Sequence, residues 1–202
     1  ISLLVSLPER ELRAGYAEVA KYGLLGDARF FTWLEKNSSA VLALEPDAIM
    51  YAIRKSCEAK ARIVEADERE AGKRALLNLG HTFAHAFEAE SGYNGSLLHG
   101  EAVAAGLGLA FDLSVDLGIC AADHASRCKT HLQTVGLPSG QSDLATGNIS
   151  AHRLIEHMRH DKKMRNGKIH FILVRAIGEA FISGDVPSDK LKTLLERDKN
   201  VV

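Results

Sequence analysis

This chain of 202 residues lacks a disulfide framework, a large excess of either charge and any long apolar run. Its three cysteines, Cys57, Cys120 and Cys128, are too few and too widely spaced for a disulfide framework or a CxxC site. The 25 basic and 26 acidic residues give a net charge of −1, which argues against a nucleic-acid footprint and a polybasic membrane surface. No apolar run approaches the roughly 18 residues that a membrane span requires. We therefore expect a cytoplasmic protein with reduced thiols that binds neither nucleic acid nor membrane.

Helical periodicity covers most of the chain, and its hydrophobic content of 46% is ordinary for a globular protein with a core. The predicted helices span 9–25, 28–44, 48–71, 76–90, 99–118, 123–135 and 151–159. In the fifth of these, small residues such as Ala102, Gly106 and Gly108 suit close approach between helices. Two β-rich runs, 168–174 and 179–182, predict a single hairpin. We expect one mainly α, multi-helix domain over residues 1–202, with one short β-hairpin near the C-terminus.

Three histidines carry the most informative pattern. His81 and His85 are four residues apart, so a helix stacks them on one face. His99 follows a loop rich in Gly, Asn and Ser and opens the next helical run, from which it can point toward that face. Catalytic zinc sites often combine two histidines with one carboxylate and leave a position open. Thr82 follows His81, so the pattern is not the HExxH of metalloproteases.

A carboxylate would have to complete such a site. Glu18 lies on an otherwise apolar, small-residue helix face and shares that face with Lys21, three residues on. An ordinary surface Glu–Lys pair would have the same spacing. Glu88, Glu90 and Glu101 are rivals that the residues alone do not exclude.

Cations form a second group. Lys60 lies in the third predicted helix, Arg74 lies seven residues before His81, and Lys162 and Lys163 follow in an HDKK run. Near a metal cleft they would suit a phosphorylated or carboxylated substrate, with arginine able to make bidentate contacts. The alternative for each of them is a solvated helix face.

Five segments, in this order and at this spacing, resemble the C-terminal domain of the 3-dehydroquinate synthase family: ELRAGYAEVAKYGLL, SCEAKARIVEADERE, KRALLNLGHTFAHAFEAESGY, LLHGEAVAAGL and HDKKMRNGKIHFIL. Together they are far more specific than any one of them. The resemblance implies the C-terminal half of the dehydroquinate synthase-like fold. It also implies that the ligands of a zinc or cobalt ion are Glu18, His81 and His99. The implied substrate-binding residues are Lys21, Lys60, Arg74, Asn78, His85 and one of Lys162 and Lys163.

The same resemblance implies the chemistry. The substrate would be the sugar-acid phosphate 3-deoxy-D-arabino-heptulosonate 7-phosphate, and NAD would transiently oxidise a ring hydroxyl before phosphate leaves and the carbocycle closes to 3-dehydroquinate. A divalent metal would polarise that hydroxyl. His85 would carry protons, because an unperturbed imidazole titrates near neutral pH. Lys60 and Arg74 would be the other catalytic residues, binding the substrate carboxylate and stabilising negative charge.

The family's N-terminal half, a nucleotide-binding domain, has no counterpart here, because the chain contains neither βαβ alternation nor GxGxxG. The sequence begins at Ile1, and we expect a piece of a longer protein that does not turn over substrate alone. NAD contacts are expected mainly in the missing half, and a homodimer is implied for the full-length enzyme. Alternatives are another sugar-phosphate cyclase, such as 2-deoxy-scyllo-inosose synthase, and a non-catalytic helical scaffold. Iron- or zinc-dependent glycerol and alcohol dehydrogenases differ in ligand spacing.

Overall fold

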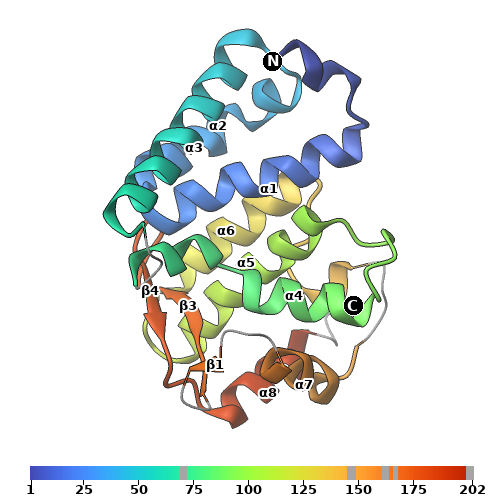
Figure 1. Ribbon diagram of the computed structural model, residues 1–202, viewed down its shortest axis with the longest axis vertical. Helices are drawn as coiled ribbons and strands as arrows, with labels where there is room; N and C mark the ends of the chain where they lie inside the picture. Colours follow the sequence, from blue (N-terminus) through green and yellow to red (C-terminus); the bar gives the residue numbers. More distant parts are fainter. Residues whose placement is uncertain (69–71, 145–148, 161–163, 166–167, 199–202) are drawn as a thin grey trace.

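The computed structural model describes residues 1–68, 72–144, 149–160, 164–165 and 168–198 (Figure 1). Its α-helices are α1 (Glu9–Gly26), α2 (Ala28–Leu42), α3 (Pro46–Ala66), α4 (His81–Glu90), α5 (His99–Asp116), α6 (Ala122–Thr134), α7 (Ala151–His160) and α8 (Ser188–Asp198). Short 3-10 helices are η1 (Ser2–Ser6), η2 (Lys73–Asn78) and η3 (Gln141–Asp143). The strands are β1 (Met164–Arg165), β2 (Lys168–Ile169), β3 (Phe171–Val174) and β4 (Ala180–Ser183).

Local sequence sets the ends of the first helices. Asp27 ends α1 and caps α2, because its side chain accepts a hydrogen bond from the Phe30 N–H at 2.9 Å. Pro46 is the first residue of α3, where its missing N–H costs no helical hydrogen bond. The chain turns at these two points, and α2 and α3 pack beside α1 toward the end of the molecule that carries the N-terminus (Figure 1).

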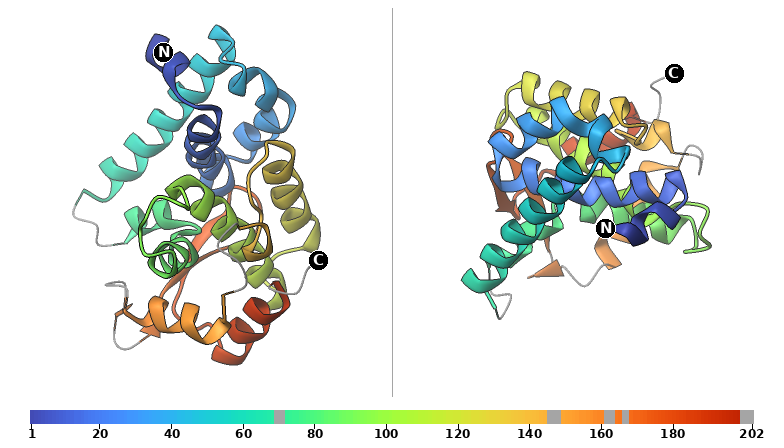
Figure 2. Two further views of the ribbon diagram at one scale, coloured as in Figure 1. Left: turned by 90° about the vertical axis from the view of Figure 1, so that its right-hand side faces the viewer. Right: turned by 90° about the horizontal axis from the view of Figure 1, so that it is seen from above.

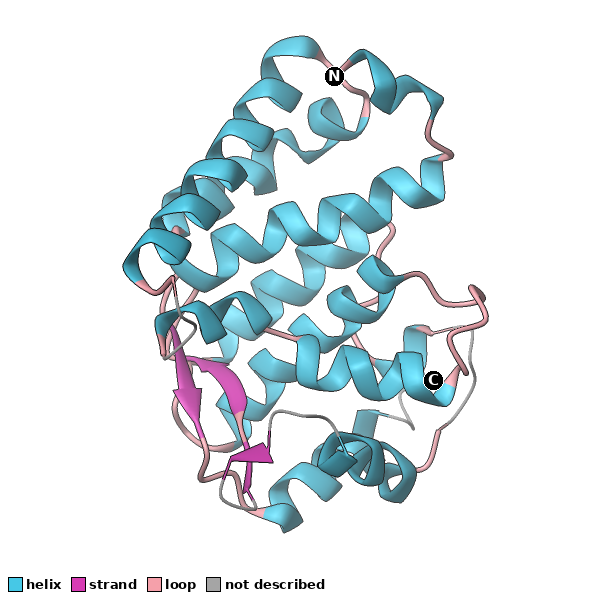
Figure 3. Cartoon of the chain, in the orientation of Figure 1, coloured by secondary structure: helices cyan, strands magenta, loops and turns pink. Residues whose placement is uncertain are grey.

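Helix α5 is the centre of the core. Its residues from Ala102 to Phe111 are all buried, and it packs against α1, α4, α6, α8 and β3 (Figures 1 and 2). The strands lie together at one edge of the molecule (Figure 3), with the fully buried β3 against α5. A helix enclosed on all sides explains why apolar and small residues run around α5 without a polar face.

Glycines bring α5 to backbone contact with its neighbours. A Cβ on Gly100 would lie 1.9 Å from the carbonyl oxygen of Ala14 in α1. A Cβ on Gly106 would lie 2.2 Å from the carbonyl oxygen of Gly80, just before α4. Gly80 itself has φ +81°, a conformation that disfavours any side chain. The expected close approach of small residues is therefore confirmed, and it fixes α1 and α4 against α5.

The mainly α architecture with a hairpin near the C-terminus is confirmed. β3 and β4 pair antiparallel from Phe171 with Ser183 to Val174 with Ala180. The predicted first strand began too early, because Lys168–Ile169 pairs instead with Met164–Arg165 in a second, two-residue hairpin.

Two predicted helices were wrong in extent, and one helix was not predicted. The helix predicted over 48–71 ends at Ala66, where the Asp67 side chain accepts the backbone N–H groups of Gly72 and Arg74 and turns the chain. The helix predicted over 76–90 is split into η2 and α4 by the left-handed Gly80. Helix α8 was not predicted. Among the described residues no helix combines the length and the apolar character needed to cross a bilayer.

Candidate metal centre

Helix α1 contributes a carboxylate and a lysine. Lys21 donates a hydrogen bond from Nζ to Oε2 of Glu18 at 2.6 Å. The pair has the predicted spacing but is no ordinary surface pair, because the Lys21 side chain is only 4% exposed. Burial lowers the pKa of Lys21, the Glu18 carboxylate opposes that shift, and the nearby charge of Lys60 adds to it. Because this hydrogen bond uses Oε2, Oε1 of Glu18 is not bound to Lys21.

His81 is the first residue of α4. Its Nδ1 lies 3.1 Å from the carbonyl oxygen of Leu79. A carbonyl can only accept a hydrogen bond, so Nδ1 carries the proton and Nε2 of the neutral ring presents its lone pair. That Nε2 lies 3.7 Å from Oε1 of Glu18. The ring is therefore oriented as a metal-binding histidine is.

His99 is the first residue of α5 and has a similar arrangement. Its Nδ1 lies 2.9 Å from Oε1 of Glu88, and its Nε2 lies 3.9 Å from Oε1 of Glu18. The His81 and His99 rings meet edge to face with centroids 5.4 Å apart. Both Nε2 atoms thus face the same carboxylate oxygen.

The three side chains fit a divalent metal. One ligand atom from each of Glu18, His81 and His99 lies within 4.8 Å of the others. Oε1 of Glu18 is buried and has no hydrogen-bond partner among the described residues. A buried unsatisfied carboxylate oxygen is costly, and a cation beside it would remove that cost. Two neutral imidazoles and one carboxylate are a common donor set for catalytic zinc.

The rival carboxylates have other partners. Glu88 binds His99 at Nδ1, on the side of the ring away from the cluster. Glu90 accepts from Arg153 and His157 at 2.9 Å each. Glu101 accepts the Leu98 N–H at 2.9 Å, which caps α5, and it also binds an arginine of α1. None of the three shares the space between Glu18 and the two histidines.

The predicted substrate residues lie on elements around this cluster. His85 is one turn beyond His81, with ring centroids 5.7 Å apart. Arg74 and Asn78 lie on η2, which packs against α1 and against α3, the helix of Lys60. Lys162 and Lys163 lie outside the described residues. Lys60 is exposed, and the backbone N–H of Arg74 binds Asp67.

A hollow of about 430 Å³ lies beside the cluster, with a lining that includes His85, Glu88, Tyr93, His99 and His157. His157 was not predicted as a site residue. Its signal in the sequence is weak, since it is one of several basic residues in the last turns of α7. The concentration of imidazoles around one hollow extends the site from α4 and α5 to α7.

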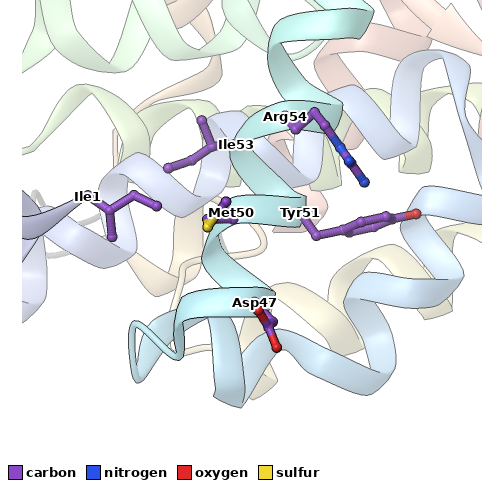
Figure 4. Close-up of a pocket in the computed structure, with 6 residues that line it drawn as sticks. All are labelled: Ile1, Asp47, Met50, Tyr51, Ile53 and Arg54. Carbon is purple, nitrogen blue, oxygen red and sulfur yellow. The ribbon is translucent and has the colours of Figure 1, made fainter.

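Another depression lies far from this chemistry. It has a volume of about 480 Å³ and is lined by Ile1, Asp47, Met50, Tyr51, Ile53 and Arg54 (Figure 4). The lining is mostly apolar and contains none of the predicted site residues. It therefore has no part in the metal centre.

The fold is that of the dehydroquinate synthase-like cyclases. A solved structure of 2-epi-5-epi-valiolone synthase from Streptomyces hygroscopicus subsp. jinggangensis 5008, with NAD+ and Zn2+ bound, matches 98% of this chain and 54% of its own, with TM-score 0.84 and 27% identity. A structure of 2-deoxy-scyllo-inosose synthase with carbaglucose-6-phosphate, NAD+ and Co2+ matches 96% of this chain and 54% of its own, with TM-score 0.80 and 20% identity. That second likeness shows the fold alone.

The chain belongs to the 3-dehydroquinate synthase family: the family model described as 3-dehydroquinate synthase C-terminal matches residues 15–164. The 3-dehydroquinate synthase of Cereibacter sphaeroides (strain ATCC 17023) is 52% identical over 97% of this chain and 53% of its own length. That of Caulobacter vibrioides (strain NA1000) is 50% identical over 96% of this chain and 53% of its own. The chain thus spans about half the length of these curated relatives.

Proposed function

We propose that this chain is the metal- and substrate-binding part of a 3-dehydroquinate synthase. The full enzyme would convert 3-deoxy-D-arabino-heptulosonate 7-phosphate to 3-dehydroquinate and phosphate, with catalytic NAD and a divalent metal, zinc or cobalt, in the cytoplasm. The metal ligands are Glu18, His81 and His99. The remaining half of the enzyme binds NAD, and the full-length protein is a homodimer.

The buried Oε1 of Glu18 is the observation that carries this proposal. It has no hydrogen-bond partner among the described residues, yet two imidazole Nε2 atoms lie 3.7 and 3.9 Å away. Each imidazole has its Nδ1 occupied by an acceptor. Lys21 holds the other oxygen of Glu18. A divalent cation between these three side chains would give Oε1 of Glu18 the partner that it lacks among the described residues.

The chemistry expected of each residue follows from its type and position. A divalent metal, when bound, supplies a Lewis acid that lowers the pKa of a substrate hydroxyl. His85, next to His81 on α4, accepts and returns protons as the hydroxyl reacts. Lys60 and Arg74 bind the carboxylate and stabilise negative charge, Asn78 donates a hydrogen bond, and one of Lys162 and Lys163 adds a further positive charge.

Phosphate release by the intact enzyme tests this function. With NAD and Zn2+ or Co2+, we expect turnover of 3-deoxy-D-arabino-heptulosonate 7-phosphate that falls about 100-fold or more in Glu18→Gln, because a metal ligand and its charge are lost. Glu101→Gln is the matched control, since its carboxylate caps α5 outside the cluster. Equal losses in both variants would refute the assignment of Glu18.

The isolated chain of 202 residues should bind the metal and release no phosphate, because the nucleotide-binding half is missing. Phosphate release by this chain alone, supplied with NAD and metal, would contradict the proposal that catalysis also needs the nucleotide-binding half. A panel of sugar phosphates on the intact enzyme separates dehydroquinate synthase from the related cyclases. Relatives 50–52% identical are named 3-dehydroquinate synthase, which favours the first substrate.

A further inference from the structure

We propose that Glu88 is the positioning residue of the metal centre: its carboxylate holds the His99 ring so that Nε2 faces Glu18 and a divalent metal between them. Glu88 touches no substrate in this proposal and is not a ligand. The inference rests on the proposed function and adds a fourth residue to the centre.

The geometry around His99 carries the inference. The His99 side chain is 50% exposed, so packing alone does not fix its ring. The Glu88 side chain is only 15% exposed, and it lies seven residues after His81 on the same face of α4. Its Oε1 is 2.9 Å from Nδ1 of His99. A carboxylate only accepts hydrogen bonds, so this contact puts the proton on Nδ1 and directs the Nε2 lone pair toward the cluster.

His81 provides an internal comparison. Its side chain is only 12% exposed, and the Leu79 carbonyl accepts from its Nδ1. The less exposed histidine thus has a neutral backbone acceptor at Nδ1, and the more exposed one has a charged side chain there. A carboxylate behind a ligating imidazole also increases electron donation to the metal and adds negative charge nearby. His99 is therefore the ligand whose strength depends most on its partner.

A simple structural role for the Glu88–His99 contact would be to join α4 to α5. Those helices already meet through their backbones, since a Cβ on Gly106 would lie 2.2 Å from the Gly80 carbonyl oxygen. Ion pairs with one half-exposed partner contribute little to folding stability. The effect of the contact therefore falls mainly on the orientation of the His99 ring.

Metal affinity of the chain, measured by chelator competition with Zn2+ and Co2+, tests the role. We expect Glu88→Ala to weaken binding by about 10–100-fold. Glu88→Gln should lose less, because the amide oxygen still accepts from Nδ1, and it should alter the visible Co2+ spectrum. Glu90→Gln is the matched control: it lies on the same helix, is 16% exposed, and pairs with His157 and Arg153 away from the cluster. Its affinity should stay within about twofold of the parent.

Unfolding in urea with EDTA completes the design, and the two glutamine variants should lose similar, small amounts of stability. Unchanged metal affinity in both Glu88 variants would overturn the inference, and so would equal losses of metal affinity in Glu88→Gln and Glu90→Gln. Glu18→Gln and His81→Ala are measured in parallel. Normal metal binding by those two would refute the metal centre itself, whereas loss of binding in them without loss in the Glu88 variants would refute only the role of Glu88.

Discussion

Replacing Gly100 with alanine should separate the two helices that carry Glu18 and His99. The new Cβ would lie 1.9 Å from the Ala14 carbonyl oxygen, 1.5 Å short of the 3.4 Å at which ordinary contact begins. Backbone cannot rotate away as a side chain can, so α1 and α5 must move apart by a distance of that order. Overpacking of this kind costs about 2–3 kcal/mol, which lowers the melting temperature by about 5–10 °C in a chain of this size.

We expect the metal affinity to change more than the folding stability does when the two helices separate. Metal–ligand bonds tolerate deviations of about 0.2 Å, far less than the expected separation. We expect metal affinity in Gly100→Ala to fall by about tenfold or more, measured by chelator competition beside urea unfolding in EDTA. The control is Gly15→Ala in α1, where a Cβ meets nothing within 4 Å and should stabilise the helix by about 0.5–1 kcal/mol. Unchanged stability and affinity in Gly100→Ala would refute this account of how the ligands are held.

Further outcomes concern pH, packing and metal. Burial lowers the pKa of His131 to about 4. As the pH falls from 6.5 to 4, the unfolded chain therefore binds a proton before the folded chain does, and about 3 kcal/mol of folding stability is lost. His131→Gln should flatten the dependence of stability on pH over this range, measured by urea unfolding. Phe111→Ala removes a fully buried ring of α5 and should cost about 3–5 kcal/mol in urea unfolding, a loss under about 1 kcal/mol contradicting its place in the core. Zn2+ at about 100 times its Kd should raise the free energy of unfolding by about 2.7 kcal/mol, and EDTA or His99→Ala should abolish the gain.

Local pattern was sufficient to predict most of the helices and the placement of His81 and His85 on one face of α4. The periodicity of 99–118 and its small residues indicated a helix in close contact with others, and α5 has that role. The ends of helices were less predictable where one side chain decides them. Asp67 stops α3 by accepting two backbone N–H groups beyond it, and no periodicity encodes that choice.

Predicting Glu18 as the proposed third ligand needed more than spacing. Glu18 is 63 positions before His81, and only the fold brings α1 beside α4 and α5. From the residues alone Glu18 was a good candidate, but Glu88, Glu90 and Glu101 were not excluded, and the family resemblance was required to prefer Glu18. The contact between Glu88 and His99 could not be predicted at all, because it depends on how the start of α5 faces the end of α4.

The backbone contacts of α5 also bear on how such enzymes diverge. Gly100 fixes α1 and Gly106 fixes the start of α4, so the positions of Glu18, His81 and His99 depend on α5. Helix α3, which carries Lys60, packs mainly on α1, α2 and η2. In the proposed function, substitution of Lys60 would change anion binding without altering the backbone contacts of Gly100 and Gly106. Under that proposal, the residues that select the substrate can change while the backbone contacts that place Glu18, His81 and His99 are kept.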